Sequence, residues 1–416
     1  MVHLTKVQER AQSSTPPDFS AIISTMGYRY LVLGAGMQGA AAAYDLASFG
    51  EAELVTLADS DLDRATAAAA RVNRLTLSNL ALAARVDVRD GRTLSESFQG
   101  YDIVLSAVPY RFNLAITEAA IAARVGMCDL GGNTAIVLEQ LKLDSEAREA
   151  GVTVIPDCGL APGMANTLAV YAMSKMDNPR EIRIWCGGLP QHPRPPLGYK
   201  LVFSIEGLTN EYFGKAQVLR GGKVVEVATL TELEELEFPP PVGRCEAFIT
   251  AGGTSTCPWT FAGKLQRYEY KTVRYPGHYE KIKLLRDLGF LDPEPVKVGG
   301  AEVSPRQLFH KLVPPRISFP DEPDLVVLRV ACSGLDSGHP MEVQLEMMEF
   351  ADESTGFSAM ERTTAFPAAI VAETIARGEL ERGVIPLERV VPPAPFVAEL
   401  ARRGFALMET VRRPLH

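Results

Sequence analysis

Apolar and polar positions in the first part of the chain alternate between two repeating patterns. Short apolar runs, which are typical of buried strands, occupy residues 30–33, 53–58, 84–90, 101–109, 127–130 and 152–156. Between them lie stretches with helical spacing, several of them rich in alanine, at 39–50, 62–75, 93–98, 113–124 and 134–150. Strands that alternate with helices pair in parallel, so the pattern predicts an α/β fold with a doubly wound Rossmann sheet.

The pattern changes after one more helix, which we expect to end near Met176. Residues 180–350 contain strand-like stretches with several proline breaks, and within them only 279–288 shows clear helical spacing. Helical patterns return at 361–377 and, interrupted by prolines, at 382–416. We expect these last helices to pack back on the first domain.

These changes predict a discontinuous nucleotide-binding Rossmann domain at 27–165 and 356–416. A second α+β domain on a mixed or antiparallel sheet, which we expect to bind substrate, would occupy 166–355. Residues 1–26 contain charges and no long apolar segment, so we interpret them as a loosely ordered extension and not as a signal peptide.

The first apolar run ends in a glycine motif with the spacing G-x-G-x-x-G, formed by Gly34, Gly36 and Gly39 around Met37 and Gln38. Its first glycine would make a tight turn, its second would let the backbone approach a pyrophosphate, and its third would let helix and strand pack closely. The N–H groups at the start of the following helix would meet the phosphate charge. The context of strand, turn and helix therefore predicts a dinucleotide site.

Asp59 ends the second predicted strand, 20 residues after the last glycine, where such folds place the acid that binds the ribose hydroxyls. A carboxylate there would repel a 2′-phosphate, so we expect NAD as the cofactor in preference to NADP. Arg64 could instead reach such a phosphate, although pairing with Asp61 on the next helix is the simpler interpretation.

Other cofactor contacts are expected where further strands end, because ligands of parallel sheets bind at the carboxyl ends of the strands. Asp87 and Val88 fall where such folds border the adenine. The segment after the fourth strand would contribute Ala107, Val108 and Pro109.

Composition excludes several classes of protein. The chain has 416 residues, with 42 Lys and Arg against 51 Asp and Glu, so its formal net charge is −9. A nucleic-acid binder needs a basic surface, which this balance does not favour, and no apolar run approaches the roughly 20 residues of a membrane-spanning helix. The six cysteines form no C-x-x-C pair or Cys/His cluster, so we expect no metal site and a cytoplasmic location.

Seven motifs resemble the saccharopine dehydrogenase/reductase-like oxidoreductases, and together they cover the chain in collinear order from about residue 28 to 415. They are VLGAGMQG at 32–39, DLGG at 129–132, IPDCGLAPGM at 155–164, GGLP with PPL at 187–197, VFSIEGL at 202–208, EAF with GGTST at 246–256, and YEYKTVRYPGH at 268–278. The later motifs are more specific than the glycine triplet.

Within that family the chain most closely resembles the deaminating lysine 6-dehydrogenases. This resemblance implies NAD-dependent oxidation of a terminal amine to an imine, which water hydrolyses to 2-aminoadipate 6-semialdehyde and ammonia. It also implies a homodimer assembled through the second domain. An enzyme acting on a secondary amine, such as saccharopine or carboxynorspermidine, is the alternative.

Proton transfer would need a positioned acid or base, because the nicotinamide carries the electronic chemistry of hydride transfer. Asp129 and Asp157 each end a predicted strand, and in the family context Asp129 is the better candidate, with capping of a loop as its alternative role. His278 follows a Pro-Gly turn and is the second candidate catalytic residue, with a surface or helix-cap histidine as the alternative interpretation.

Side-chain alternation in the strand at 268–275 limits which residues can share a site. Tyr270 and Arg274 would face one side and Lys271 the other. A carboxylate-bearing substrate favours a bidentate cation, so we expect Arg274, with Tyr270, to bind it.

Four further residues complete the expected substrate site. Thr254 and Ser255 belong to a glycine and hydroxyl-rich loop that suits a carboxylate as well as a plain hairpin. Tyr110 follows the fourth strand. Glu206 occupies a stretch near which saccharopine-type relatives tend to place a cation, so its carboxylate favours an ammonium group over a second acid.

Overall fold

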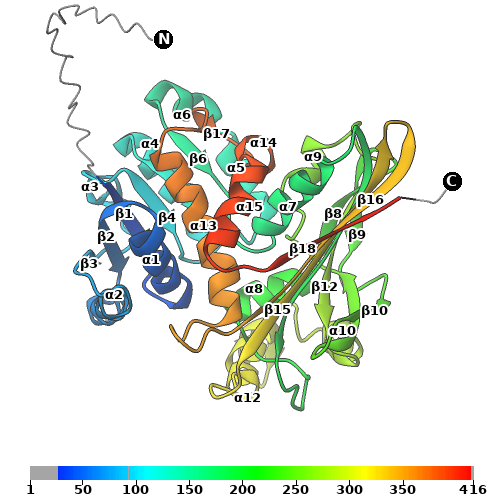
Figure 1. The fold of residues 1–416 in the computed structure, drawn as a ribbon. Helices are drawn as coiled ribbons and strands as arrows, with labels where there is room; N and C mark the ends of the chain where they lie inside the picture. Colours follow the sequence, from blue (N-terminus) through cyan, green and yellow to red (C-terminus); the bar gives the residue numbers. More distant parts are fainter. Residues whose placement is uncertain (1–26, 92, 414–416) are drawn as a thin grey trace, which may run out of the picture.

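The computed structural model describes residues 27–91 and 93–413, which form a parallel sheet and a mixed sheet with helices packed around both (Figure 1). The expected extension at 1–26 lies outside the described residues. A small hairpin, β13 (Val296–Val298) with β14 (Ala301–Val303), stands apart from the two sheets.

The first sheet has seven parallel strands in the order β17-β6-β5-β4-β1-β2-β3. Their bounds are β1 Tyr28–Leu33, β2 Ala52–Asp59, β3 Ala81–Arg85, β4 Ile103–Ser106, β5 Gly126–Asp129, β6 Thr153–Ile155 and β17 Gly383–Val384. The strand order reverses between β1 and β4, which is the topological switch point of a Rossmann fold. The predicted doubly wound sheet is confirmed, although its third strand begins earlier than the apolar pattern indicated.

Alternate residues of β1 pack on opposite faces of this sheet, as a period of two requires. Tyr30 and Val32 face a core formed with α1 (Met37–Phe49) and α2 (Leu62–Thr76), whereas Leu31 and Leu33 face another core. Helices on that second side are α3 Leu94–Ser97, α4 Asn113–Ala123, α5 Thr134–Leu141 and α6 Asp144–Ala150, with a short 3-10 turn at Tyr110–Phe112. The single helix expected at 134–150 is therefore two helices.

The second sheet has nine strands, of which β12 and β7 pair in parallel while the other pairs are antiparallel. They are β7 Asn178–Pro190, β8 Lys215–Arg220, β9 Lys223–Ala228, β10 Glu234–Phe238, β11 Gly243–Ile249, β12 Arg267–Arg274, β15 Asp324–Asp336, β16 His339–Phe350 and β18 Leu407–Arg412. The predicted mixed sheet is confirmed.

The strand β18 corrects the expectation that the whole C-terminal segment is helical and packs on the first domain. It pairs antiparallel with β16 at the edge of the mixed sheet, and Figure 1 shows it in red along that sheet. The side chains of Met408, Glu409, Thr410 and Val411 are all exposed, on both faces of the strand. The segment therefore lacks the apolar face that marks an interior strand.

Six helices lie between β6 and β15, whereas the sequence indicated two, the helix ending near Met176 and the one at 279–288. They are α7 Met164–Met173, α8 Ile205–Tyr212, α9 Cys257–Thr260, α10 His278–Asp287, α11 Pro305–Leu312 and α12 Pro314–Ile317. Of these, α8 begins at Ser204, whose hydroxyl accepts a hydrogen bond from the Gly207 N–H. Among the described residues, no helix has the length and apolar character needed to span a membrane.

The C-terminal helix α13 (Ala359–Ala376) connects the two sheets and stands between them in Figure 1. Its N-terminus is capped by Ser358, and the buried Asp324 of β15 accepts hydrogen bonds from the Ala359 and Met360 N–H groups. Further along, it packs against α1, β4 and β5 of the parallel sheet. Two more helices follow, α14 (Leu387–Val390) and α15 (Pro393–Arg402).

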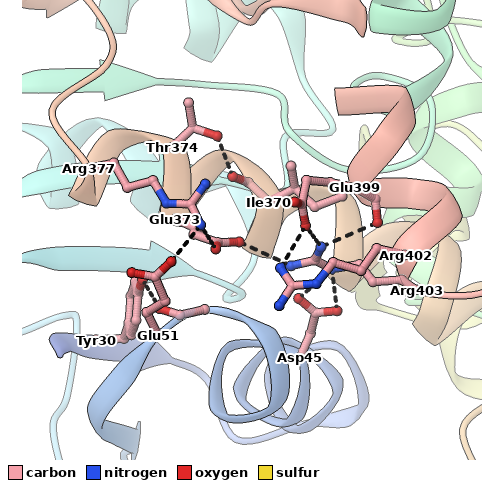
Figure 2. Close-up of polar contacts among 11 residues, drawn as sticks. Tyr30, Asp45, Glu51, Ile370, Glu373, Thr374, Arg377, Glu399, Arg402 and Arg403 are labelled. Carbon is pink, nitrogen blue, oxygen red and sulfur yellow. Dashed lines mark hydrogen bonds and ion pairs between the residues drawn. The ribbon is translucent and has the colours of Figure 1, made fainter. Parts of the chain in front are cut away.

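A buried ionic network holds this C-terminal segment on the parallel sheet (Figure 2). Arg403, whose side chain has no solvent exposure, donates its Nε–H to both oxygens of the Asp45 carboxylate of α1, at 3.0 and 2.8 Å. The same guanidinium pairs with Glu373 of α13 at 3.2 Å and with Glu399 of α15. Burial raises the pKa of Asp45 to about 6, although Arg403 acts in the opposite direction.

Removal of the buried cation should destabilise the protein strongly. Arg403→Leu leaves the buried Asp45 carboxylate without a cation, whereas Glu373 keeps Arg377 and Glu399 keeps Arg402. We therefore expect a loss of about 3–5 kcal/mol of unfolding free energy at pH 8. The folded-state pKa of Asp45 lies above its unfolded value, so its contribution to stability is complete at low pH and lost as the pH rises through about 6. Since a protonated Asp45 needs no cation, the loss should be smaller at pH 5.

Urea denaturation of the two proteins at both pH values measures this difference. Arg402→Leu is the matched control, because Arg402 is half-exposed and its ion pair with Glu399 lies at the surface; we expect it to cost less than about 1 kcal/mol. Equal losses in the two variants would contradict the role given to the buried network.

Candidate functional site

A cavity of about 310 Å³ opens between the parallel sheet and the mixed sheet. The parallel sheet contributes residues 107–110 after β4 and 130–132 after β5. The mixed sheet contributes the end of β12, and α8 with the residues before it covers another side. The cavity therefore lies at the carboxyl ends of the parallel strands, where ligands of this fold class bind.

The glycine motif has the geometry that a dinucleotide site requires. Gly34 has a φ of +93°, and a side chain on Gly39 would place its Cβ 1.7 Å from the Gly34 carbonyl oxygen, so the turn and the helix contact both need glycine. A Cβ on Gly36 would meet nothing within 4 Å, so its backbone faces open space. Beside it, Met37 is exposed and Gln38 lines the cavity with a buried Oε1 that lacks a partner among the described residues.

Asp59 lies at the end of β2 beside this turn. One carboxylate oxygen accepts a hydrogen bond from the Ala35 N–H at 3.0 Å, and the other accepts one from the Asp61 N–H at 3.0 Å. Each carboxylate oxygen has a second acceptor position, so Asp59 can still accept ribose hydroxyls. Arg64 lies 3.7 Å from Asp59 and 3.9 Å from Asp61, so it contacts both acids and not Asp61 alone. These residues fit the adenosine end of a dinucleotide.

The remaining expected cofactor residues fall into two groups. Ala107, Val108 and Pro109 line the cavity next to Gln38, where a nicotinamide ring would reach the substrate. Asp87 and Val88 follow β3 outside the cavity, and Asp87 pairs with Arg89 at 2.6 Å. Their contact with adenine stays a prediction.

Arg274 is the buried cation of the cavity, with 2% exposure. Its Nε donates to the Tyr212 hydroxyl at 3.0 Å, and its Nη1 donates to the Val273 carbonyl at 2.8 Å. The guanidinium also lies 4.8 Å from the centre of the Tyr199 ring. As the strand alternation predicted, Tyr270 and Thr272 line the cavity with it, whereas Lys271 turns away and pairs with Glu234 at 3.1 Å.

Glu211, in the last turn of α8, is a cavity residue that the sequence analysis missed. Its carboxylate lies 3.6 Å from Arg274 Nη2, and burial raises its pKa to about 7, against the opposing effect of Arg274. No motif marks this position. It belongs to the site because β12 places Arg274 opposite a helix that the apolar pattern did not reveal.

Glu206 and Tyr110 line the cavity as expected, but the surroundings of Glu206 correct one inference. Arg111, next to Tyr110, pairs with the Glu206 carboxylate at 2.5 Å. A cation therefore does stand near this carboxylate, contributed by the parallel-sheet domain. Both side chains are about half-exposed, so the pair lies in contact with solvent.

The structure does not bring the two expected catalytic residues into the cavity. Asp129 is fully buried behind its wall, where its oxygens accept hydrogen bonds from the N–H groups of Gly131 and Asp157 and from the Gln140 amide. Burial raises the pKa of Asp129. The carboxylate thus holds the loop that forms the cavity wall, which was the alternative role for this residue.

His278 is also buried, and burial together with Arg274 lowers its pKa to about 3, so the ring is neutral at physiological pH. Its Nδ1 lies 3.2 Å from the Leu197 carbonyl oxygen, and its Nε2 lies 3.0 Å from the Tyr212 hydroxyl. With a proton on Nδ1, the ring donates to Leu197 and accepts from Tyr212, which in turn accepts from Arg274. His278 therefore positions Arg274 and is not placed to act as an acid or base on a substrate.

Thr254 and Ser255 also turn away from the cavity, which corrects their expected role as substrate ligands. Thr254 donates to the Gln217 carbonyl at 2.9 Å, and Ser255 donates to the Asp157 carboxylate at 2.5 Å. Burial raises the pKa of Asp157 to about 7, with a further contribution from Asp129.

In residues 27–91 and 93–413, no group of three or more His, Cys, Asp or Glu side chains could hold a metal ion.

Two family models match the chain, and they agree with this architecture. Residues 30–155 match the saccharopine dehydrogenase NADP binding domain, and residues 159–405 match the saccharopine dehydrogenase C-terminal domain. Together with the glycine turn and the interdomain cavity, these matches define a two-domain chain with a dinucleotide-binding domain of the dehydrogenase type. The chain belongs to the saccharopine dehydrogenase family.

The individual relatives have low sequence identity to this chain. The chain is 28% identical over 254 residues to the saccharopine dehydrogenase [NADP(+), L-glutamate-forming] of Pyricularia oryzae, covering 58% of this chain but only 53% of that enzyme. It is 25% identical over 324 residues to the carboxynorspermidine synthase of Vibrio cholerae, covering 73% and 76% of the two chains. The chain thus spans about half the length of the first relative.

A solved structure confirms the fold over nearly the whole chain. The apo saccharopine dehydrogenase (L-Glu forming) of Saccharomyces cerevisiae superposes with a TM-score of 0.72 at 20% identity, covering 93% of this chain and all of that one. At this identity the likeness concerns the fold alone.

Asp59 should determine which dinucleotide binds. Asp59→Asn keeps one side-chain oxygen, and so one of the two backbone contacts, but removes the charge that opposes a 2′-phosphate. It also leaves Arg64 free to pair with that phosphate. We expect the ratio of NADH to NADPH affinity to fall about 10- to 100-fold, measured by fluorescence titration without substrate. Asp63→Asn on the exposed first turn of α2 is the control, and a parallel change for both dinucleotides would contradict this role.

Proposed function

We propose that this protein oxidises the terminal amine of L-lysine with NAD, releasing ammonia and 2-aminoadipate 6-semialdehyde, and that it works as a cytoplasmic homodimer. The proposal rests on the motifs that resemble the deaminating members of the family and on the charges of the cavity.

The balance of charge in the cavity is the observation that carries this proposal. Its charged lining residues are two carboxylates, Glu206 and Glu211, and one guanidinium, Arg274. Lysine presents the complementary set, with two ammonium groups and one carboxylate. Saccharopine would bring three carboxylates to a single buried cation, and unpaired charges in such a site are costly.

The residues around the cavity would divide the work between binding and orientation. Arg274 would bind the substrate carboxylate, since its Nη groups retain free N–H donors, and Glu206 would attract the terminal ammonium. The nicotinamide, when bound, accepts the hydride from the substrate carbon. Val108 and Pro109 would form the wall that sets the distance between the two reactants.

The alternative is oxidation or formation of a secondary amine, as the names of the Pyricularia oryzae and Vibrio cholerae relatives suggest. The contact between Arg111 and Glu206 favours this reading, because Arg111 could leave the ion pair to bind a second carboxylate. In that case a free keto acid or aldehyde would be required for the reverse reaction.

Turnover of a small panel of amines separates the two functions. Purified protein with NAD is given L-lysine, L-ornithine, saccharopine or carboxynorspermidine, while NADH absorbance and ammonia are followed together. We expect NADH and ammonia in equal amounts with lysine alone. Reduction of NAD by a secondary amine without ammonia would establish the alternative.

Arg274→Ala should raise the KM for lysine by about 100-fold, because it removes a charge-assisted bidentate contact worth about 3 kcal/mol. The KM for NAD should stay within about threefold, since Arg274 lies on β12 and not on the nucleotide-binding strands. Steady-state kinetics with each substrate varied in turn measures both constants. An equal rise in both KM values would contradict the assignment of Arg274 to the substrate carboxylate.

A further inference from the structure

The carboxylate of Glu211 and the guanidinium of Arg274 form an ion pair without a direct hydrogen bond at the wall of the cavity. Their closest atoms are 3.6 Å apart, beyond the usual hydrogen-bond distance, and among the described residues Arg274 is the one cation within ion-pair distance of Glu211. By contrast, in another buried pair the Arg403 Nε–H is hydrogen-bonded to both Asp45 oxygens, at 3.0 and 2.8 Å. The Glu211 and Arg274 charges are therefore only partly satisfied by each other.

Each member of this pair is held in place by contacts that leave its charged end free. Two hydrogen bonds, to Tyr212 and to the Val273 carbonyl, fix the Arg274 guanidinium, and His278 fixes Tyr212 in turn. Glu211 is anchored through its backbone, whose carbonyl accepts from the Ala251 N–H at 2.9 Å. The side chain of Glu211 keeps 24% exposure, and the residue lines the cavity.

We propose that Glu211 and Arg274 together bind the head group of an α-amino acid, with Arg274 on its carboxylate and Glu211 on its α-ammonium. The two charges of such a head group are carried by one carbon, so they require an anion and a cation side by side. The rest of the substrate would then extend toward Val108 and Pro109 on the opposite wall. This assignment deepens the proposed function, because it makes the α-ammonium a second recognition point beside the carboxylate.

The pair gives the site a specificity that Arg274 alone would not provide. A simple monocarboxylate would satisfy the guanidinium but would bring a negative charge close to Glu211. A diamine without a carboxylate would leave Arg274 buried and unpaired. Only a ligand that carries both charges on one carbon completes the pair, so the site would select α-amino acids over ω-amino acids and diamines.

Glu211 is the group of this pair that changes charge near neutral pH. Facing it are Arg274 and Tyr270 of β12, Cys186 of β7, Tyr199 before α8, and Tyr212 and Glu206 of α8. Burial raises the pKa of Cys186 and of Tyr212 to about 12 and that of Tyr199 and Tyr270 above the usual value, so these groups stay neutral. The pKa of Glu211 itself is raised to about 7 by burial.

Binding of two matched probes tests this proposal without turnover. L-Norleucine has the head group of lysine and no terminal amine, whereas hexanoate also lacks the α-ammonium. Calorimetry with the complex of enzyme and NAD should show norleucine binding about 10- to 100-fold more tightly than hexanoate at pH 8. Norleucine affinity should rise as the pH increases through 7, and hexanoate affinity should fall.

Glu211→Gln keeps the shape of the side chain and removes its charge, so it should abolish both the preference for norleucine and the opposite pH trends. Glu206→Gln removes the same charge from the same helix and cavity, and should keep the ratio of the two affinities within about threefold. Equal weakening of both probes by Glu211→Gln, or no preference in the unmodified enzyme, would overturn the proposal.

These outcomes are separate from those of the proposed function. If lysine is not oxidised but norleucine is preferred through Glu211, the deamination fails and the head-group site stands. If lysine is oxidised and Glu211→Gln leaves the preference intact, the deamination stands and this assignment fails.

Discussion

A positive charge without access to water, that of Arg403, constrains how the two halves of this molecule meet. Its neutralising carboxylates come from α1, α13 and α15, so the charge is stable only when all three helices lie in one arrangement (Figure 2). The N-terminal end of α13 is meanwhile bound by Asp324 of the mixed sheet. One helix is thus fixed at one end to each sheet, and it contributes Met360 and Thr364 to the cavity wall. The shape of the cavity follows from this double attachment.

The parts of the fold that the sequence predicted well are those that depend on local pattern. The glycine motif, the alternation of strands and helices, and the two faces of β12 each reflect contacts that a short segment makes with one kind of environment. The strand β18 was missed because it is an edge strand whose partly exposed side chains show no apolar alternation. Likewise α8 is only eight residues long, with Ser204 and Glu206 as its main local signals.

In the candidate site, too, the residues that local pattern marks were predicted, and those that depend on long-range packing were not. The glycine motif with Asp59, and Arg274 with Tyr270, could be identified from the sequence. In each case the residue type, together with its place at the end or on one face of a strand, indicates what it binds. Asp129, His278 and Ser255 have equally suitable chemistry, but in the structure their polar atoms are occupied by the loops around them. Glu211 has no distinguishing context in the sequence, and it meets Arg274 only because of where β12 lies. Whether a polar group is occupied or free is a property of long-range packing, which single residues and spacings do not encode.

The return of the chain to its first sheet also determines the order in which the molecule can be completed during synthesis. Strands β1 to β6 leave the ribosome early, but the sheet face that includes Gly126 of β5 is covered by Ile375 of α13, and the edge strand β17 follows at residue 383. The nucleotide-binding unit therefore cannot mature ahead of the remainder, as the first domain of a sequentially arranged protein does. The mixed sheet is completed later still, because its strand β18 is the last strand along the chain. Both units therefore depend on the last part of the chain, and until it is synthesised the sheet face that α13 covers stays exposed.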